Sequence, residues 1–597
     1  MSLLLSPTFS RALRWFPWAA IAVLLVMRLC HEWFGPDIWY HLALGERIAH
    51  SGSAQPADNL LLQQPGFVNV YWLFQLLVRG IFALGGLVGV SALFIVVWFA
   101  TFATWLRTTG APRHAPWGAG LALGAVLVCQ TRFEERPEVF SFLFLALQIH
   151  ALARWDLSAA PARGALARFT IIQILWSNLH GYFVLGPMLV AAKLVSVAAA
   201  TPRADWPRLR AAWRGLWLLA ALTVAATLAS PFGVRNWTGV ATLWTFFGAM
   251  RHEVQEFLPP TGAFAALWTV KLFWLGWTLT ALGALYLLLA AARRELFALV
   301  LAAAGLWLSA TSFRNIPLLV FFSAPLTAVV LRRLAGFRPL EGPAALAVGA
   351  GALGLAITTI AGPFKSPAFG LRVSTAASPA YFADYLRSVP FAGTLFNHPG
   401  DGGYLEFYFP ALRLYGDSRY VNVAPVRTYF TALRQPGDFR ALNAARHFDA
   451  ALFRLTSSRA VLGDLLRGAR WRLVYADLHR ALLVDASRPA AAAFAHESLV
   501  YYRGEDLAVR ANRDAALQWI VLFAEINYPA ELLRVLHAFA AAPRIPAVVI
   551  EAALRYSLAA QRHEIADAAR ALRPKMIVAQ PADAGVVDRL LAQAGAR

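Results

Sequence analysis

Cysteine and charged side chains are both scarce in this chain. Only two of its 597 residues are cysteines, Cys30 and Cys129, and both lie at the ends of apolar runs. Two cysteines exclude a disulfide framework and a cysteine-based metal site. Charged residues make up 15% of the chain and hydrophobic residues 59%, with a mean hydropathy of +0.53. This composition excludes an ordinary soluble protein.

Lysine and acidic residues are also few, so the net charge comes from arginine. The 54 basic residues exceed the 33 acidic ones, which gives a formal net charge of +21. A basic excess often indicates nucleic-acid binding, but most of these arginines occupy short loops between apolar runs. Membrane topology explains the charge better, and we expect no nucleic-acid partner.

Apolar runs long enough to cross a bilayer fill the first ~360 residues. We predict about eleven transmembrane helices from them. They lie near residues 14–30, 87–106, 117–131, 138–154, 169–178, 182–199, 213–230, 264–291, 295–311, 316–331 and 343–362. The first follows Arg11 and Arg14 without a clear cleavage site, so we expect a retained helix and not a signal peptide.

Residues 71–86 fit two interpretations. They form either a separate short span or an amphipathic helix on the outer surface that leads into 87–106. Arg79 favours the surface helix, because an arginine at mid-bilayer costs roughly 2.5–3.5 kcal/mol.

The loops between the apolar runs alternate in charge. One set is rich in arginine, and short loops of this kind stay in the cytoplasm. Its members are Arg11/Arg14, Arg107/Arg113, Arg154/Arg163/Arg168, Arg203/Arg208/Arg210/Arg214, Arg293/Arg294 and Arg332/Arg333/Arg338. The other set carries Asp, Glu, Asn and His, at residues 31–70, 131–138, 178–181, 231–262 and 311–317. We therefore expect one face of the membrane, the outer one, to carry the function.

The composition changes after Gly362, which predicts three parts. Residues 1–362 form an α-helical polytopic membrane bundle with a first outer loop at 31–86. Residues 363–510 form a soluble α/β domain, and residues 511–597 a helical C-terminal segment. An odd number of crossings places both later parts on the outer side.

Short β-like runs alternate with helical stretches in the soluble domain. The β-like runs are Gly393–Phe396, Leu412–Tyr415, Ala450–Phe453, Trp471–Tyr475 and Ala481–Val484, and the helical stretches are Ala377–Ser388, Val426–Leu433 and Ser458–Leu466. The glycine-rich stretch Asn397–Tyr404 is expected to be a turn, with a structural or covering role. The C-terminal segment reads as stacked helical hairpins separated near Asn527, Pro543–Pro546 and Pro581, with no repeat signature.

Asp37 is the strongest candidate for catalysis. It opens a segment in which Asp37 and His41, four residues apart, share one face of a helix. A carboxylate at the membrane surface is well placed to act as a general base toward an amphiphilic substrate. The alternative is that Asp37 only caps the helix opened by Pro36, and that His41 is an interfacial hydrogen-bonding residue.

Three outer arginines are candidates for binding a lipid phosphate. Arg132 and Arg136 belong to the charged run Arg132–Glu138, and Arg314 lies between two apolar spans. Arginine suits the forked recognition of phosphate, and charge at such depth is a functional candidate by default. The alternatives are a salt-bridged turn for Arg132 and Arg136, and for Arg314 a pairing with Glu253 or Glu256 that holds the bundle together.

His180 and Glu253 complete the candidate substrate-binding residues. Asn178–Gly181 interrupts an apolar region, which is tolerated only where protein covers the backbone or a cavity adjoins it. His180 is therefore either a binding residue or part of a capped helix break. Arg251-His252-Glu253-x-x-Glu256 lacks the two-histidine spacing of zinc hydrolases, so we predict no zinc site.

Several short motifs, in order, resemble one family of bacterial polytopic membrane proteins. They cover most of residues 10–485, and the family is grouped with the GT-C superfamily of lipid-linked-sugar glycosyltransferases. The motifs are Pro36-Asp37-Ile38-Trp39-Tyr40-His41-Leu42, Gln55-Pro56-Ala57-Asp58, Tyr71-Trp72-Leu73, Arg136-Pro137-Glu138, Trp176-Ser177-Asn178-Leu179-His180-Gly181, Ser230-Pro231-Phe232-Gly233, Glu253 to Pro260, Arg314-Asn315-Ile316-Pro317, Gly402-Gly403-Tyr404-Leu405 and Asp417-Ser418-Arg419.

The resemblance implies an integral-membrane glycosyltransferase that takes sugar from a polyprenyl-phosphate donor at the outer leaflet. Asp37 matches the essential acidic position of the superfamily's first outer loop. Relatives often have two carboxylates where this chain has Gly35-Pro36-Asp37, so the resemblance leaves open whether a divalent cation binds there, and Asp58 is a further acid in the loop. The expected location is the bacterial inner membrane, with an envelope glycan, lipid or protein as acceptor.

Two other classes of function remain open from the sequence. A secondary transporter keeps its site near the midplane, often between internal repeats, whereas the polar residues here gather on one side and no repeat is visible. A non-catalytic envelope scaffold would use the helical tail to recruit partners, with the outer charges only stabilising the bundle.

Overall fold

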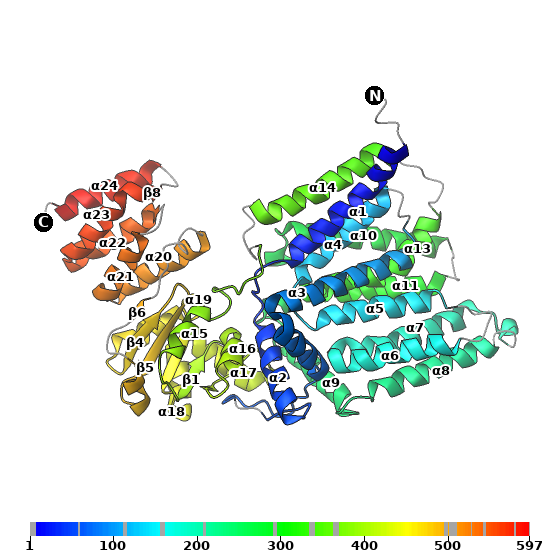
Figure 1. Cartoon of the computed structure of the whole chain (residues 1–597), viewed down its shortest axis with the longest axis horizontal. Coiled ribbons are helices and arrows are strands. Elements are labelled where there is room, and N and C mark those ends of the chain that lie inside the picture. The colour runs from blue at the N-terminus through cyan, green and yellow to red at the C-terminus, as the bar shows by residue number, and fades with distance from the viewer. Residues whose placement is uncertain are drawn as a thin grey trace. The chain divides into compact units, whose positions relative to one another are not determined.

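The computed structural model describes residues 7–57, 60–111, 116–155, 162–206, 210–290, 295–333, 341–361, 369–494, 499–500, 510–526, 528–540, 545–577 and 581–595. The chain divides into two compact units, residues 1–56 with 65–373, and residues 57–64 with 374–597 (Figure 1). Parts of the expected cytoplasmic loops lie outside the described residues, namely Arg113, Arg208, Arg293, Arg294 and Arg338, as do Asp58 and the expected breaks at Asn527 and Pro543.

The first unit is helical throughout its described part (Figure 1). Its α-helices are α1 (Pro7–Leu29), α2 (Asp37–Ser51), α3 (Trp72–Thr109), α4 (Pro116–Cys129), α5 (Glu138–Ala153), α6 (Arg163–Leu179), α7 (Leu185–Ala200), α8 (Arg210–Thr227), α9 (Arg235–Ala249), α10 (Trp268–Leu289), α11 (Leu296–Thr311), α12 (Ile316–Phe322), α13 (Ala324–Arg333) and α14 (Glu341–Ala361). Short 3-10 turns lie between them, including η2 (Gln130–Arg132), η3 (Gly181–Val184), η5 (Gln255–Phe257) and η8 (Phe313–Asn315). Helices α1 and α14, from opposite ends of this unit's sequence, pack along each other.

The number of membrane crossings stays a prediction. In the described part of the chain, three helices are long and apolar enough to span a bilayer: Trp72–Thr109, Gly181–Ala200 and Trp268–Leu289. The bent pair Phe313–Phe322 and Ala324–Arg333 adds a fourth if it is one broken span. Five further apolar stretches of 10–17 residues lie in α1, α5, α8, α11 and α14.

A kink at Gly86 divides α3 where the sequence placed a boundary. Gly86 has φ 53° and ψ −142°, a backbone conformation that glycine adopts without steric cost. The segment before it carries Arg79, which forms an ion pair with Glu46 of α2. The predicted division between residues 71–86 and 87–106 is therefore confirmed.

The first loop is held against α3 by a close backbone approach. A Cβ on Gly45 of α2 would lie 2.3 Å from the Gln75 carbonyl oxygen and 2.7 Å from the Arg79 Cβ. Only glycine allows α2 and α3 to approach this closely without a shift. This contact fixes the helix that begins with Asp37.

One expected loop contains a helix that the sequence analysis missed. Residues 231–262 were expected to be a polar outer loop, but α9 occupies Arg235–Ala249. Half of its residues are apolar or aromatic, yet polar residues interrupt them at Asn236, Thr238 and Thr242, which hid the helix from a search for apolar runs.

The second unit contains a six-stranded mixed sheet of order β2-β1-β3-β5-β4-β6. Its strands are β1 (Thr394–Asn397), β2 (Arg413–Leu414), β3 (Ala450–Arg454), β4 (Trp471–Ala476), β5 (Arg480–Asp485) and β6 (Leu499–Val500). Strand β1 pairs in parallel with β2 and β3, and β5 pairs antiparallel with β3 and β4. The five predicted β-like runs are confirmed, and β6 is additional.

Alternate residues of these strands enter two apolar cores, one on each face of the sheet. Leu395 belongs to one core and its neighbour Phe396 to the other, and Leu482 and Leu483 divide in the same way. The helices are α15 (Ala380–Arg387), α16 (Pro399–Tyr408), α17 (Val423–Arg434), α18 (Pro436–Arg446) and α19 (Leu455–Arg467). The three predicted helical stretches are confirmed as α15, α17 and α19.

The expected turn at Asn397–Tyr404 is wrong, because helix α16 begins there. His398 occupies the N-cap position and its Nδ1 accepts a hydrogen bond from the Gly400 amide at 3.1 Å. Proline at the first helical position needs no donor, which makes Pro399 a helix start and not a turn signal. A Cβ on Gly402 would lie 2.2 Å from the Gly416 carbonyl oxygen, so the glycine pair serves packing.

The C-terminal helices pack on the α/β part of the second unit. They are α20 (Arg510–Glu525), α21 (Pro529–Phe539), α22 (Ala547–Ala560), α23 (His563–Leu572) and α24 (Pro581–Gly595). Trp519 is buried in the same core as Phe453, and its indole donates to the Asp477 carbonyl at 2.8 Å. A short parallel pair, Ile545–Pro546 with Met576–Ile577, joins the tail internally.

Candidate functional site

Seven charged side chains of the first unit gather at the turns between its helices, and we call them the charged cluster. Its members are Asp37 of α2, Arg132 of η2, Glu134 and Arg136 of the turn before α5, Glu138 of α5, Glu256 of η5 and Arg314 of η8. Every element that contributes is a helix end or a 3-10 turn, where polar side chains interrupt the apolar pattern. The turns at 131–138, 231–262 and 311–317 of the expected outer set thus meet in one place.

Arg136 is the central cation of the cluster. Its Nε lies 2.6 Å from Glu134 Oε2, and its Nη1 lies 3.1 Å from Glu256 Oε2 and 3.4 Å from Asp37 Oδ2. Three carboxylates from different turns therefore share one guanidinium, a planar group with five donors.

Arg132 and Arg314 share the buried carboxylate of Glu138. Arg132 forms a close ion pair with Glu138 Oε1, and Arg314 Nη2 lies 3.3 Å from Glu138 Oε2. Arg132 also lies 2.9 Å from Glu256 Oε2. The guanidinium of Arg314 stands over the rings of Phe247 and Phe257, with its carbon 5.0 and 5.5 Å from their centroids.

Arg132 forms the salt bridges that the structural alternative predicted, because its buried side chain pairs with both Glu138 and Glu256. For Arg314, the expected partners were Glu253 or Glu256. The carboxylate at hydrogen-bonding distance is Glu138 instead, because η8 and the start of α5 meet in the bundle.

Glu253 lies in the same turn of the chain as Glu256. Its side chain is exposed, and Glu256, three residues later, faces Arg132 and Arg136 instead. Burial alone would raise the pKa of Glu256, but Arg136 and Arg132 hold it well below its usual range. Glu138, Glu134 and Glu256 were not among the residues predicted to bind, and only their proximity to arginines in the sequence could have indicated them.

Asp37 is the first residue of α2, and it faces the cluster. The N-cap position is Pro36, where no side-chain capping hydrogen bond forms. The capping and the catalytic interpretations of Asp37 both stay predictions. Its side chain is 24% exposed, the most open carboxylate around Arg136 after Glu256.

His41 lies in the packed interior and not at the surface. It is fully buried among the rings of Tyr71 and Phe74, whose centroids are 5.5 and 4.9 Å away. Its Nδ1 lies 3.3 Å from Gln75 Nε2. His41 thus packs within the interior, and its binding role stays a prediction.

His180 caps the break between α6 and η3. Its backbone is extended, and its Nδ1 accepts hydrogen bonds from the Tyr182 amide at 3.3 Å and from the Ser141 hydroxyl at 2.8 Å. The capped helix break is therefore present, and a binding role for His180 stays a prediction. The adjacent Tyr182 hydroxyl donates to Asn315 Oδ1 at 3.1 Å, which ties this break to η8 beside Arg314.

A second buried pair lies next to the cluster. His31 Nε2 is 3.9 Å from Glu135 Oε1, and both side chains are buried. Burial raises the pKa of Glu135 to about 7, against the opposing effect of His31. Glu135 is thus a carboxyl that changes charge near neutral pH.

An apolar groove of about 300 Å³ opens beside Arg314. Aromatic and aliphatic side chains form most of its walls, and its polar lining residues are Tyr182, Arg251, Thr311, Ser312, Arg314 and Asn315. Its members come from η3, α9, α11, η8 and α12, among them Trp244, Phe247, Trp307 and Leu318. The groove has the character of a site for an apolar chain with a charged head.

The described residues do not fit a metal ion. Among them, no three His, Cys, Asp or Glu side chains come together as metal ligands. The carboxylates of the charged cluster face guanidinium groups, which occupy the positions where a cation would be coordinated. We therefore derive no chemistry through a metal.

Comparison with known structures identifies the fold. The archaeal oligosaccharyltransferase AglB from Archaeoglobus fulgidus, in complex with an inhibitory peptide and a dolichol-phosphate, matches with a TM-score of 0.50 at 12% sequence identity, over 76% of this chain and 71% of that chain. This enzyme belongs to the GT-C superfamily. The chain has the GT-C fold. The fold that the resemblance implied is thereby confirmed.

ArnT from Cupriavidus metallidurans bound to undecaprenyl phosphate, also of the GT-C superfamily, matches with a TM-score of 0.45 at 15% identity, over 78% of this chain and 97% of that chain. No protein-family profile and no curated protein sequence matches the chain. At these identities, the GT-C likeness concerns the fold, and the function must be argued from the site.

Proposed function

We propose that the protein is an integral-membrane glycosyltransferase that moves a sugar from a polyprenyl-phosphate donor to an envelope acceptor at the outer face. The observation that carries this proposal is the joining of Asp37 and Arg314 in one charged cluster beside an apolar groove. A carboxylate, a cation and a chain-binding surface are the three parts that such a transfer requires.

Asp37 is proposed as the general base. Its carboxylate is partly exposed and is held in place by Arg136 at 3.4 Å. Arg136 is itself held by Glu134 and Glu256, so the position of Asp37 does not depend on a flexible partner. Proton abstraction by a positioned carboxylate contributes typically about 10²–10⁴-fold to the rate.

Arg314 is proposed to neutralise the departing phosphate. It lines the groove, and its guanidinium stands over the rings of Phe247 and Phe257, which also line it. An isoprenoid chain would follow the aromatic and aliphatic walls, while the phosphate would meet the guanidinium. Arg136 provides a second cation on the side toward Asp37.

The reaction would proceed by a single displacement. The acceptor hydroxyl oxygen attacks the anomeric carbon and loses its proton to Asp37 Oδ. The bond between the anomeric carbon and the phosphate oxygen breaks, and its electron pair leaves with the polyprenyl phosphate. Because one face of the sugar is attacked and the other is vacated, the anomeric configuration inverts. Fixed cations aimed at the developing phosphate charge lower the barrier.

Three features are proposed as structural supports of this site. The ion pair of Glu138 with Arg132 joins two of the turns, and His180 caps the helix break beside Tyr182, whose hydroxyl donates to Asn315.

The second unit is proposed to lie on the outer side of the bacterial inner membrane. Its glycine and aspartate–arginine motifs serve its own core, since Arg419 bridges the buried Asp417 and Glu406.

The test uses Asp37→Asn in the full-length protein. We expect transfer of labelled sugar from undecaprenyl-phosphate sugars to envelope extract to fall by about 10²–10⁴-fold. Glu46→Gln is the matched control, because Glu46 is an acid of the same helix whose ion-pair partners are Arg79 and His50 and whose side chain is partly exposed. Unchanged transfer by Asp37→Asn would overturn the assignment of the base.

A second measurement needs neither the sugar nor the acceptor. Binding of undecaprenyl phosphate alone should weaken in Arg314→Gln by about tenfold or more and stay near the wild-type value in Asp37→Asn. If Arg314→Gln binds as the wild type does, the groove is not the donor site.

A further inference from the structure

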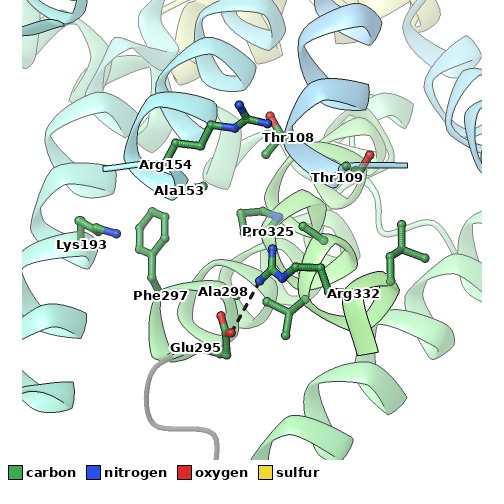
Figure 2. A pocket seen from close by; sticks show the side chains of 14 residues that line it. Thr108, Thr109, Ala153, Arg154, Lys193, Glu295, Phe297, Ala298, Pro325 and Arg332 are labelled. Atoms are coloured by element: carbon green, nitrogen blue, oxygen red, sulfur yellow. Dashed lines mark ion pairs between the residues drawn. The ribbon is translucent and has the colours of Figure 1, made fainter. Parts of the chain in front are cut away.

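A second polar cavity lies at the opposite end of helix α5 from the charged cluster. Glu138 begins α5 and Arg154 follows its last residue, so the two positions are about 24 Å apart along the helix. The cavity measures about 500 Å³ and is formed by the ends of α3, α5, α11 and α13 with the middle of α7 (Figure 2). Its polar lining residues are Thr108, Thr109, Arg154, Lys193, Glu295 and Arg332.

Lys193 is the least expected of these residues. It lies within the apolar span Gly181–Ala200, and only 8% of its surface is exposed. Its ammonium stands over the ring of Phe297, 4.9 Å from the centroid, as Figure 2 shows. A charged residue within a membrane span is costly and calls for a partner of opposite charge.

Among the described residues, Glu295 is the one acid that lines the cavity, and it already forms an ion pair with Arg332. Their charged groups are 3.7 Å apart, as the dashed line in Figure 2 marks. Arg154 donates to the Arg107 carbonyl oxygen, a neutral acceptor, at 3.1 Å. Three cations and one anion leave the cavity with a formal excess of two positive charges.

The position of the cavity limits the source of a compensating anion. Arg154 and Arg332, which line it, belong to the arginine-rich set expected in the cytoplasm, so on the proposed topology the cavity opens at the cytoplasmic leaflet. Apolar residues of α11 and α13, such as Ala298, Val329 and Leu331, continue the lining beside the cations. Basic pockets between transmembrane helices on this side suit the phosphate head groups of anionic lipids, whose chains stay against apolar walls.

We propose that this cavity binds the phosphate of an anionic phospholipid from the cytoplasmic leaflet, with Lys193 and Arg154 as its ligands. The phosphate would supply negative charge to a cavity whose described lining carries three cations and one acid. The site is independent of the proposed transfer reaction, because it shares no residue with the charged cluster or the groove beside Arg314.

The experiment measures lipid binding to the purified full-length protein in nanodiscs. Phosphatidylglycerol is titrated into phosphatidylcholine, and the bound lipid is counted by native mass spectrometry. Lys193→Met and Arg154→Gln should each weaken phosphatidylglycerol binding by about tenfold. Arg333→Gln is the matched control, because Arg333 neighbours Arg332 but stacks over the Tyr286 ring outside the cavity.

Two further arms separate the sources and guard against misfolding. Lys193→Arg should restore most of the affinity, and Lys193→Met should fold, since an apolar replacement of a buried charge is often neutral or stabilising. Glycerol phosphate, the soluble probe, should not compete. Equal phosphatidylglycerol binding by Lys193→Met, Arg333→Gln and the wild type would overturn the proposed binding site. Competition by glycerol phosphate at the same concentration would overturn the assignment of a lipid as the source of the phosphate.

Discussion

Replacement of Glu138 by glutamine tests how the charged cluster is held together. The carboxylate is 2% exposed and is shared by Arg132 and Arg314. Glutamine keeps the shape and one acceptor oxygen but removes the charge. Arg132 then retains Glu256 at 2.9 Å, whereas Arg314 loses the carboxylate with which it pairs at 3.3 Å.

The expected loss of stability follows from this geometry. Breaking a buried ion pair by removing one partner costs about 3–5 kcal/mol, because the remaining charge stays in a low-dielectric environment. Since Arg132 keeps a second carboxylate and glutamine keeps an acceptor, we expect the lower end, about 3 kcal/mol. The melting temperature of the purified protein in detergent should fall by about 5 °C or more.

Glu253→Gln is the control for this prediction. It removes an acid from the same set of outer turns, but from an exposed position, so its effect should stay within about 0.5 kcal/mol. Equal melting temperatures for Glu138→Gln and Glu253→Gln would refute the reasoning that Glu138 neutralises two buried arginines.

Two further predictions concern pH and packing. Burial raises the pKa of Glu135 to about 7, so the folded state binds this proton more tightly than the unfolded state, and the resulting stability is lost as the pH rises through 7. In thermal unfolding, Glu135→Gln should therefore be more stable than the wild type by up to about 3 kcal/mol at about pH 8 and equal to it at about pH 4. A stability difference that does not change with pH would contradict the pKa shift. Gly45→Ala forces its Cβ against the Gln75 carbonyl and should destabilise the protein by about 1–3 kcal/mol and reduce transfer activity. The control, Gly80→Ala in α3, has no atom within 4 Å of the added Cβ and should be neutral or stabilising. The same loss in both variants would show that glycine is needed for its backbone freedom and not for the close approach of the two helices.

Local patterns predicted the secondary structure well where burial was uniform. The apolar runs became helices near the expected residues, and five β-like runs became strands of one sheet, because a side-chain period of two is set by the strand itself. Prediction failed where the signal depended on context. Pro399 and Gly400 start a helix although both residues are common in turns, and α9 was hidden by its interspersed polar residues.

The composition of the site was predictable, but its pairing was not. Asp37, Arg136 and Arg314 were identified from their positions between apolar runs, and the structure brings all three into one cluster. The sequence did not show that Glu256 faces the arginines or that His41 is buried. Three residues of spacing in an irregular turn do not determine which side chain faces inward.

The amino-acid sequence by itself determined that this is a helical membrane protein with polar chemistry concentrated in alternate turns, because hydrophobic length and the placement of arginine are properties of the chain. Only the tertiary structure decided which acid meets which arginine, that a groove opens beside Arg314, and that Lys193 enters a basic cavity. These depend on distances between helices far apart in sequence, and the energy of a charge is set by such neighbours and by burial, neither of which a local pattern contains.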